Sequence, residues 1–139
     1  MFKSNTPYKS IKMKKIVLLI VLSVLILAPC TLSAQTTPDK KTVTGSWLGK
    51  LSADGMELRV VFNLKLEKDS LICTLDSPDQ GAADIPCGKV TLDKQKLVVL
   101  APEINGEYTG SVTSDSTING TWTQNGGTFT LDLKKKIIK

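Results

Sequence analysis

Apolar and polar residues alternate along most of the chain between residues 45 and 134. In the clearest run, 58–67, every second residue is apolar, so that one face carries Leu58, Val60, Phe62, Leu64 and Leu66. A repeat of two residues is typical of a strand with one buried and one exposed face. No window of this part shows the 3.6-residue repeat of an amphipathic helix, so we expect an all-β domain.

Eight such runs predict eight strands. They cover residues 45–52, 58–67, 71–76, 86–92, 96–101, 105–113, 117–124 and 128–134. Turn residues separate the runs, and Asp54-Gly55 and Asn125-Gly126 are strong hairpin signals. Short strands without a long crossover predict a small eight-stranded antiparallel meander barrel, lipocalin-like, because closure removes exposed strand edges. Large apolar side chains should fill its interior.

Polar side chains gather between the third and fourth runs, around the turn at residues 77–81. The candidate binding residues there are Asp76, Ser77, Asp79, Gln80 and Asp84. The carboxylates could form an acid/base pair or bind Ca²⁺, but the EF-hand spacing and its closing Glu are missing, so no metal site is predicted. The simpler interpretation is that these residues cap turns and keep the loop soluble.

Trp47, Tyr108 and Trp122 are the aromatic candidates for binding a ligand. A tryptophan on such a run can stack on a ligand or fill an end of the barrel as part of the core. Core packing is the interpretation that we favour for both tryptophans, because buried aromatic side chains mainly supply packing area.

Cys73 and Cys87 flank the polar loop and are candidates for a disulfide, which would close a loop of about fifteen residues. Cys73 is in phase with the apolar residues of its run, whereas Cys87 is out of phase with Val90 and Leu92. A β-bulge at Gly88 would bring both thiols to the same face. The alternative is two separate buried thiols.

Residues 1–34 have the features of a signal peptide. Lysines at 12, 14 and 15 precede an apolar run at 16–28, which is too short to cross a bilayer. Small residues at 31–34 offer a cleavage site after Ser33 or Ala34, and Met13 could be the true start. We therefore expect a signal helix and export to the periplasm or the medium.

Two alternatives would attach the chain to a membrane. The first is an uncleaved signal segment. The second is a lipoprotein anchored at Cys30, because Leu27-Ala28-Pro29-Cys30 resembles a lipobox, although Pro29 stands where a small residue is expected.

The formal charge of +5 comes from the targeting segment. Of the 18 basic residues, five lie in residues 1–34, so 13 remain against 13 acidic residues. No basic stripe with interleaved aromatic residues is present, and nucleic-acid binding is not expected. The predicted organisation after the signal peptide is a flexible lead-in at 35–44, the barrel at 45–134 and a disordered basic tail at 135–139.

Several motifs of this chain resemble the small N-terminal β-domain that precedes the catalytic domain of certain secreted bacterial α/β-hydrolases, which are serine aminopeptidase-like. The motifs lie at 47–51 (WLGKL), 58–62, 76–82 (DSPDQGA), 85–86 (IP), 108–110 and 120–124 (GTWTQ). The resemblance covers about residues 43 to 134. The chain stops where the hydrolase would begin, so the resemblance implies a free-standing accessory domain.

This resemblance implies no catalytic residue, because the family assigns none to the small domain. It implies a partner of a particular kind, a separately encoded exported hydrolase or another envelope protein. A second and shorter similarity is Gly45-Ser46-Trp47, which resembles the Gly-x-Trp motif on the first strand of lipocalins.

The residue types exclude several kinds of enzyme. The chain has no histidine, so a Ser-His-Asp or Cys-His arrangement cannot form. It contains neither a Gly-x-Ser-x-Gly elbow nor a phosphate-binding glycine-rich loop, and no cofactor is expected. We expect a non-catalytic exported interaction module that docks through its polar loop. The alternative is a lipocalin-like carrier of a small apolar ligand, which would require a cavity of several hundred Å³.

Overall fold

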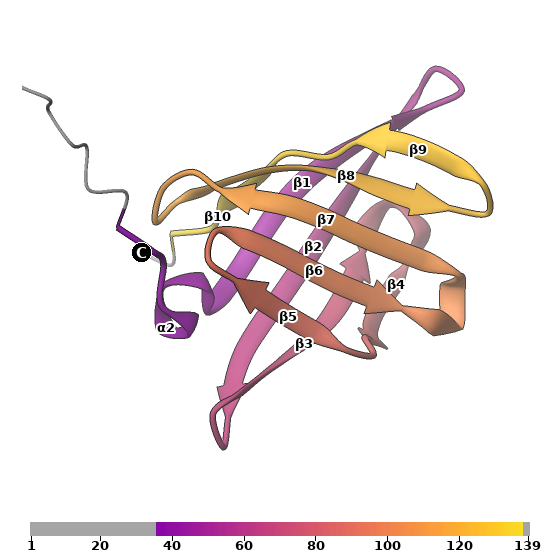
Figure 1. The fold of residues 1–139 in the computed structure, drawn as a ribbon. Coiled ribbons are helices and arrows are strands. Elements are labelled where there is room, and N and C mark those ends of the chain that lie inside the picture. Colours follow the sequence, from indigo (N-terminus) through magenta and orange to yellow (C-terminus); the bar gives the residue numbers. More distant parts are fainter. Residues whose placement is uncertain (1–35, 138–139) are drawn as a thin grey trace, which may run out of the picture. The chain divides into compact units, whose positions relative to one another are not determined.

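Ten antiparallel strands form one sheet in the computed structural model, which describes residues 36–137 (Figure 1). The first half of the chain contributes α2 (Lys40–Val43), β1 (Gly45–Ala53), β2 (Met56–Glu67), β3 (Ser70–Ser77), the 3₁₀ turn η1 (Pro78–Gln80), β4 (Ala82–Pro86) and β5 (Val90–Asp93). The second half contributes β6 (Lys96–Ala101), η2 (Pro102–Ile104), β7 (Gly106–Val112), β8 (Thr117–Gln124), β9 (Gly127–Thr130) and β10 (Leu133–Lys135). The predicted signal peptide, Met13 and Cys30 lie outside the described residues.

Strands that are neighbours in the sequence are mostly neighbours in the sheet. The order is β4-β3-β2-β1-β10-β8-β7-β6-β5, and β9 pairs with β8 beside this path. The exception is β10, which lies between β1 and β8 and so joins the two halves of the meander. Figure 1 shows β1 to β3 crossing behind β5 to β8, so that the two halves face each other across a core.

Ten strands form where eight were predicted. The first difference is a break at residues 87–89: only Pro86 of the predicted run at 86–92 belongs to β4, which otherwise covers residues 82–85 between the third and fourth predicted runs, and β5 begins at Val90. The second difference is in the run at 128–134, which is divided between β9 and β10. At the first break, Gly88 N–H donates to Leu100 O at 2.7 Å and Leu100 N–H donates to Lys89 O at 3.0 Å. Two residues therefore oppose one, which is the predicted bulge at Gly88.

The predicted all-β antiparallel fold is confirmed, but the closed ring of eight strands is not. The ladder of paired strands ends at β4 on one side and β5 on the other. The link between them, residues 87–89, bonds to both flanks: Cys87 N–H donates to Cys73 O of β3, and Gly88 N–H to Leu100 O of β6. We call this link the seam. The chain changes its pairing partner there from β3 to β6, and no pair of strands within residues 36–137 spans it.

Large side chains fill the space between the two halves. The fully buried residues include Trp47, Phe62, Leu64, Leu75, Leu97, Tyr108, Ile118, Leu131 and Leu133. The Phe62 ring lies 5.0 Å from that of Tyr108 and 6.1 Å from that of Trp122, distances typical of favourable aromatic pairs. Gly106 makes room for Trp122, because a Cβ there would lie 2.2 Å from the indole ring.

The predicted flexible lead-in at 35–44 includes a folded part. Residues 40–43 form the short helix α2, and Val43 is completely buried. Trp47 Nε1 donates to Val43 O at 2.8 Å, and Lys135 Nζ donates to Thr42 O at 2.9 Å. The residues before β1 and the start of the predicted basic tail are therefore held together.

Tight turns set the register of the hairpins. Asp54 and Gly55 have positive φ, as do Asn125 and Gly126, which is the conformation of two-residue hairpin turns with native twist. Lys68 and Asp69 adopt the same left-handed conformation without a glycine. The two hairpin signals of the sequence therefore lie at the predicted turns.

Candidate binding surface

The polar loop is held together by its own side chains. Asp76 accepts hydrogen bonds from Asn63 Nδ2 at 2.9 Å and from the Asp84 N–H at 2.9 Å. Ser77 Oγ donates to Gln80 Oε1 at 2.8 Å, and Ser77 is buried. These bonds favour the structural interpretation of Asp76, Ser77 and Gln80, because their polar atoms stabilise the loop itself.

The Asp79 side chain binds β2 at a position beyond the end of the pairing between β2 and β3. The last residue pair between these strands is Val61 with Asp76. Beyond it, the Arg59 N–H donates to Asp79 Oδ2 at 2.7 Å, and the Arg59 side chain forms a 2.6 Å ion pair with Oδ1. The side-chain and backbone hydrogen bonds from Arg59 lower the pKa of Asp79 to about 2. The carboxylate thus takes the place of the next strand.

A small cavity of about 160 Å³ lies where the η1 and η2 turns approach the core. Among the predicted site residues it brings together Asp76, Ser77, Gln80 and Trp122. Its remaining lining residues are Leu51, Leu58, Val60, Leu75, Ile85, Ile104 and Gln124. Trp122 Nε1 donates to Gln124 Oε1 at 3.2 Å, so its polar atom has a protein partner. Asp79 and Asp84 do not line this cavity.

The other aromatic candidates lie in the core. Trp47 and Tyr108 have no exposed surface, and Trp122 is 4% exposed. Burial raises the pKa of Tyr108, whose hydroxyl points at the Ile118 carbonyl at 3.5 Å. These positions favour core packing over ligand stacking for Trp47 and Tyr108.

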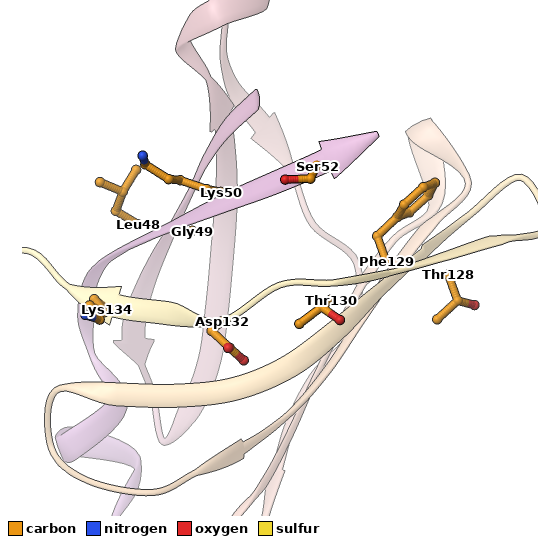
Figure 2. A pocket seen from close by; sticks show the side chains of 9 residues that line it. All are labelled: Leu48, Gly49, Lys50, Ser52, Thr128, Phe129, Thr130, Asp132 and Lys134. Carbon is orange, nitrogen blue, oxygen red and sulfur yellow. The ribbon is translucent and has the colours of Figure 1, made fainter. Parts of the chain in front are cut away.

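A groove of about 750 Å³ lies between β1 and β9 (Figure 2). It is lined by Leu48, Gly49, Lys50 and Ser52 from β1, by Thr128, Phe129 and Thr130 from β9, and by Asp132 and Lys134. Figure 2 shows the two strands diverging from Gly49 toward Ser52 and Phe129. None of these residues was among the predicted site residues.

The groove exists because β1 loses its neighbour halfway along its length. β1 pairs with β10 only from Trp47 to Gly49, whereas its pairing with β2 continues to Ala53. Beyond Gly49 the strand on this side of β1 is β9, but β9 pairs with Thr121–Gln124 of β8. Asp132 lies between β9 and β10, and its Oδ1 accepts the Gly120 N–H at 3.1 Å. The irregularity at 131–132 therefore turns β9 away from β1.

Backbone groups of both strands face this groove. In an antiparallel ladder, successive residues direct their N–H and C=O groups alternately to the two sides. Lys136 N–H donates to Ser46 O, so even-numbered residues of β1, including Lys50 and Ser52, face the β10 and β9 side. Leu131 N–H donates to Gly120 O of β8, so Thr128 and Thr130 face away from β8 and toward the groove.

The side chains around the groove are mixed in character. Phe129 is half-buried and packs against the core, and Leu48 is half-buried on β1. Lys50 forms a 2.7 Å ion pair with Glu57. The hydroxyl groups of Ser52, Thr128 and Thr130 line the remaining wall. The sequence offered no signal for this site, because each strand separately shows an ordinary alternating pattern.

Cys73 and Cys87 are free thiols that lie opposite each other, Cys73 on β3 and Cys87 directly after β4. Cys73 is 5% exposed, and Cys87 is half-buried and packs against the same core. Ile85 and Cys87 before the bulge, and Val90 and Leu92 after it, all pack against the core. The bulge thus removes the phase conflict that the sequence showed.

Within residues 36–137, no group of three or more Cys, Asp, Glu or His residues is arranged to hold a metal ion. In the same range, no helix has the length and apolar character needed to cross a membrane.

Comparison with known proteins gave no matching family model and no matching curated protein. Among solved structures, the chain is similar to a redesigned β-barrel, mFAP1, bound to DFHBI. The sequences are 13% identical, and the match covers 70% of this chain and 97% of the other with a TM-score of 0.48.

Proposed function

We propose that this protein is a non-catalytic, exported interaction module, and that its binding site is the groove between β1 and β9. The observation that carries the proposal is the contrast between a filled interior and an open groove of about 750 Å³ on the wall. A surface where two strand edges diverge suits a macromolecular partner better than an enclosed small molecule.

The occupant that fits the groove is an extended polypeptide segment. Lys50 and Ser52 on one side and Thr128 and Thr130 on the other present backbone donors and acceptors, which a strand can pair with. Phe129 lines the groove and offers an apolar contact for one inward side chain of such a segment. Main-chain bonds would supply affinity, and the side-chain contacts would supply selectivity.

The partner we propose is a separately encoded exported hydrolase or another envelope protein. This part of the proposal draws on the resemblance of the chain to accessory domains of secreted α/β-hydrolases, and it is an argument by analogy. The export of the protein and the lipocalin-like character of its fold belong to the same proposal.

A carrier of a small apolar ligand is the second candidate. It is favoured by the cavity of about 160 Å³ beside Trp122, which has an apolar lining and a polar rim at Asp76 and Gln80. Ligand pockets usually measure about 300–1,000 Å³, so the cavity would have to enlarge before it could hold a typical ligand.

Cross-linking from the native envelope tests the interaction module. Lys50 and Lys134 line the groove and can be joined to a bound segment by an amine-reactive reagent. We expect partner peptides on these two lysines, and at least a tenfold loss of that cross-linked species in Thr130→Arg, which fills the groove. Ser111→Arg, on an exposed position of β7, is the matched control and should retain it.

Two outcomes would contradict the proposal. One is a set of cross-links confined to lysines outside the groove, such as Lys89 and Lys96. The other is equal recovery of the groove cross-links in Thr130→Arg and Ser111→Arg. For the carrier, native mass spectrometry should show added mass that Trp122→Ala removes.

A further inference from the structure

Two thiols face each other beside the seam of the sheet, one on β3 and one directly after β4. Cys87 N–H donates to Cys73 O at 3.1 Å, so the two residues oppose each other in a hydrogen-bonded antiparallel pair. The Cα atoms of such a pair lie about 5.5 Å apart. This separation is inside the 4.4–6.8 Å range that a disulfide spans without movement of the backbone. Residues opposed in this way also direct their side chains to the same face.

The two thiols differ in access. Cys73 is 5% exposed and belongs to the buried core, whereas Cys87 is half-buried at the end of β4, next to the bulge. A reagent from solution therefore reaches Cys87 first. Cys73 Sγ donates to the Thr74 carbonyl at 3.4 Å. The neighbouring Cys73 thiol lowers the pKa of Cys87, and the neighbouring Cys87 thiol together with burial raises the pKa of Cys73.

We infer that Cys73 and Cys87 form a dithiol that exchanges with small disulfides and closes into a cross-strand disulfide at the seam. Cys87 is the entry thiol, and Cys73 is the resolving thiol. The substrate class is low-molecular-weight disulfides such as glutathione disulfide. This site is separate from the groove, so its test is independent of the proposed interaction module.

The exchange has two steps. The Cys87 thiolate attacks one sulfur of glutathione disulfide, breaks its S–S bond and releases one glutathione thiolate. Cys73 then loses its proton to solvent and attacks the Cys87 sulfur, which releases the second glutathione as a thiolate. The released thiolates take up protons. Two protein thiols are oxidised to one disulfide, and one glutathione disulfide is reduced to two thiols.

Closure would act on the seam. The residues between the two cysteines include η1 and β4, and the ladder of strand pairs ends at β4. The disulfide would link β3 to the residue that follows β4, just before the chain begins to pair with β6. Closing a loop of this length restricts the unfolded chain, so we expect oxidation to raise the Tm by roughly 5–15 °C.

The test is a redox titration of the full chain in glutathione buffers, with differential alkylation and peptide mapping by mass spectrometry. We expect one peptide pair linked through Cys73 and Cys87 that appears in a single two-electron transition. Cys73→Ser should accumulate a mixed disulfide with one glutathione on Cys87. In Cys87→Ser, Cys73 should react with glutathione disulfide at least tenfold more slowly than Cys87 does in Cys73→Ser.

The asymmetry between the variants is the decisive result. Equal reactivity of Cys73 and Cys87 in the two single variants would overturn the assignment of roles. Two thiols that remain free in the folded protein under excess glutathione disulfide would overturn the site itself. Cys73→Ala and Cys87→Ala repeat the measurement, and near-UV circular dichroism of the aromatic core confirms that each variant is folded.

Discussion

At the scale of single residues, Asp79 illustrates how a loop side chain can complete a sheet. Its carboxylate accepts the Arg59 N–H at 2.7 Å, at a position where β3 no longer accompanies β2. The same carboxylate holds the Arg59 side chain. The sequence singled out Asp79 as a candidate binding residue, but its partner on β2 lies twenty residues earlier. Only the fold brings the two together.

This contact predicts a pH dependence. The hydrogen bonds from Arg59 lower the pKa of Asp79 from 3.8 to about 2, so the charged carboxylate stabilises the folded state above about pH 4. That contribution is lost as the pH falls through 2, because the folded state then also binds the proton. We expect the urea midpoint of Asp79→Asn to be slightly lower than wild type at pH 7.

The same variant should depend less on pH between 4 and 2 than wild type does. Urea titrations followed by tryptophan fluorescence across this range measure both effects. Asp115→Asn, in the exposed turn between β7 and β8, is the control and should keep the wild-type dependence. A wild-type slope in Asp79→Asn would contradict the role assigned to the Arg59 pair.

At the scale of elements, sequence patterns predicted most strands and their turns but not how strands are interrupted. Alternation located the first three strands, and the two hairpin signals lie at the turns that join β1 to β2 and β8 to β9. The bulge at Gly88 followed from the phase of Cys87 against Val90. The break at 131–132 had no such signal, because Phe129, Leu131 and Leu133 continue one alternating series.

The helix α2 was missed for a related reason. Four residues are too few for a helical repeat, and α2 is held by contacts that arrive from elsewhere in the chain. Trp47 Nε1 and Lys135 Nζ each donate to a carbonyl of this segment, and the Lys135 ammonium lies 5.3 Å from the Trp47 ring centre. Sequence-local reasoning cannot find an element that distant residues stabilise.

A substitution at Val43 measures what α2 contributes. Val43 is completely buried, and Val43→Ala removes apolar contact while leaving the backbone bonds in place. We expect a loss of about 2 kcal/mol in the free energy of unfolding, measured with urea. Val98→Ala removes the same atoms from a partly exposed position on β6 and should cost less than half as much. Equal losses would mean that α2 is not docked as described.

At the scale of the whole molecule, the arrangement of strands creates the groove. The fold class follows from the alternating pattern, and the filled core was expected from the large inward side chains. The groove was not, because it depends on where β10 stops pairing with β1 and where β9 turns toward β8. Those are relations between distant segments. The predicted loop residues, in contrast, bind one another or side chains and backbone groups of β2.

Amide hydrogen exchange can test the groove directly in the free protein. Lys50 and Ser52 direct their N–H groups toward the groove, whereas Gly49 and Leu51 direct theirs to β2. We expect the first pair to exchange at least a hundredfold faster than the second when measured residue by residue by NMR. Comparable protection of all four amides would show that the groove edge of β1 is already paired.

The ladder between β1 and β10 also sets a condition on how a newly made chain can fold. β1 can pair with β2 as soon as the hairpin between them forms. The other edge of β1 stays uncovered until β10 is available, because Trp47 pairs there with Lys135. Closure between such distant segments carries a high entropic cost and tends to be slow. During synthesis, that uncovered edge is open to pairing with other chains. A holding chaperone would therefore matter most in the interval before residues 133–135 become available.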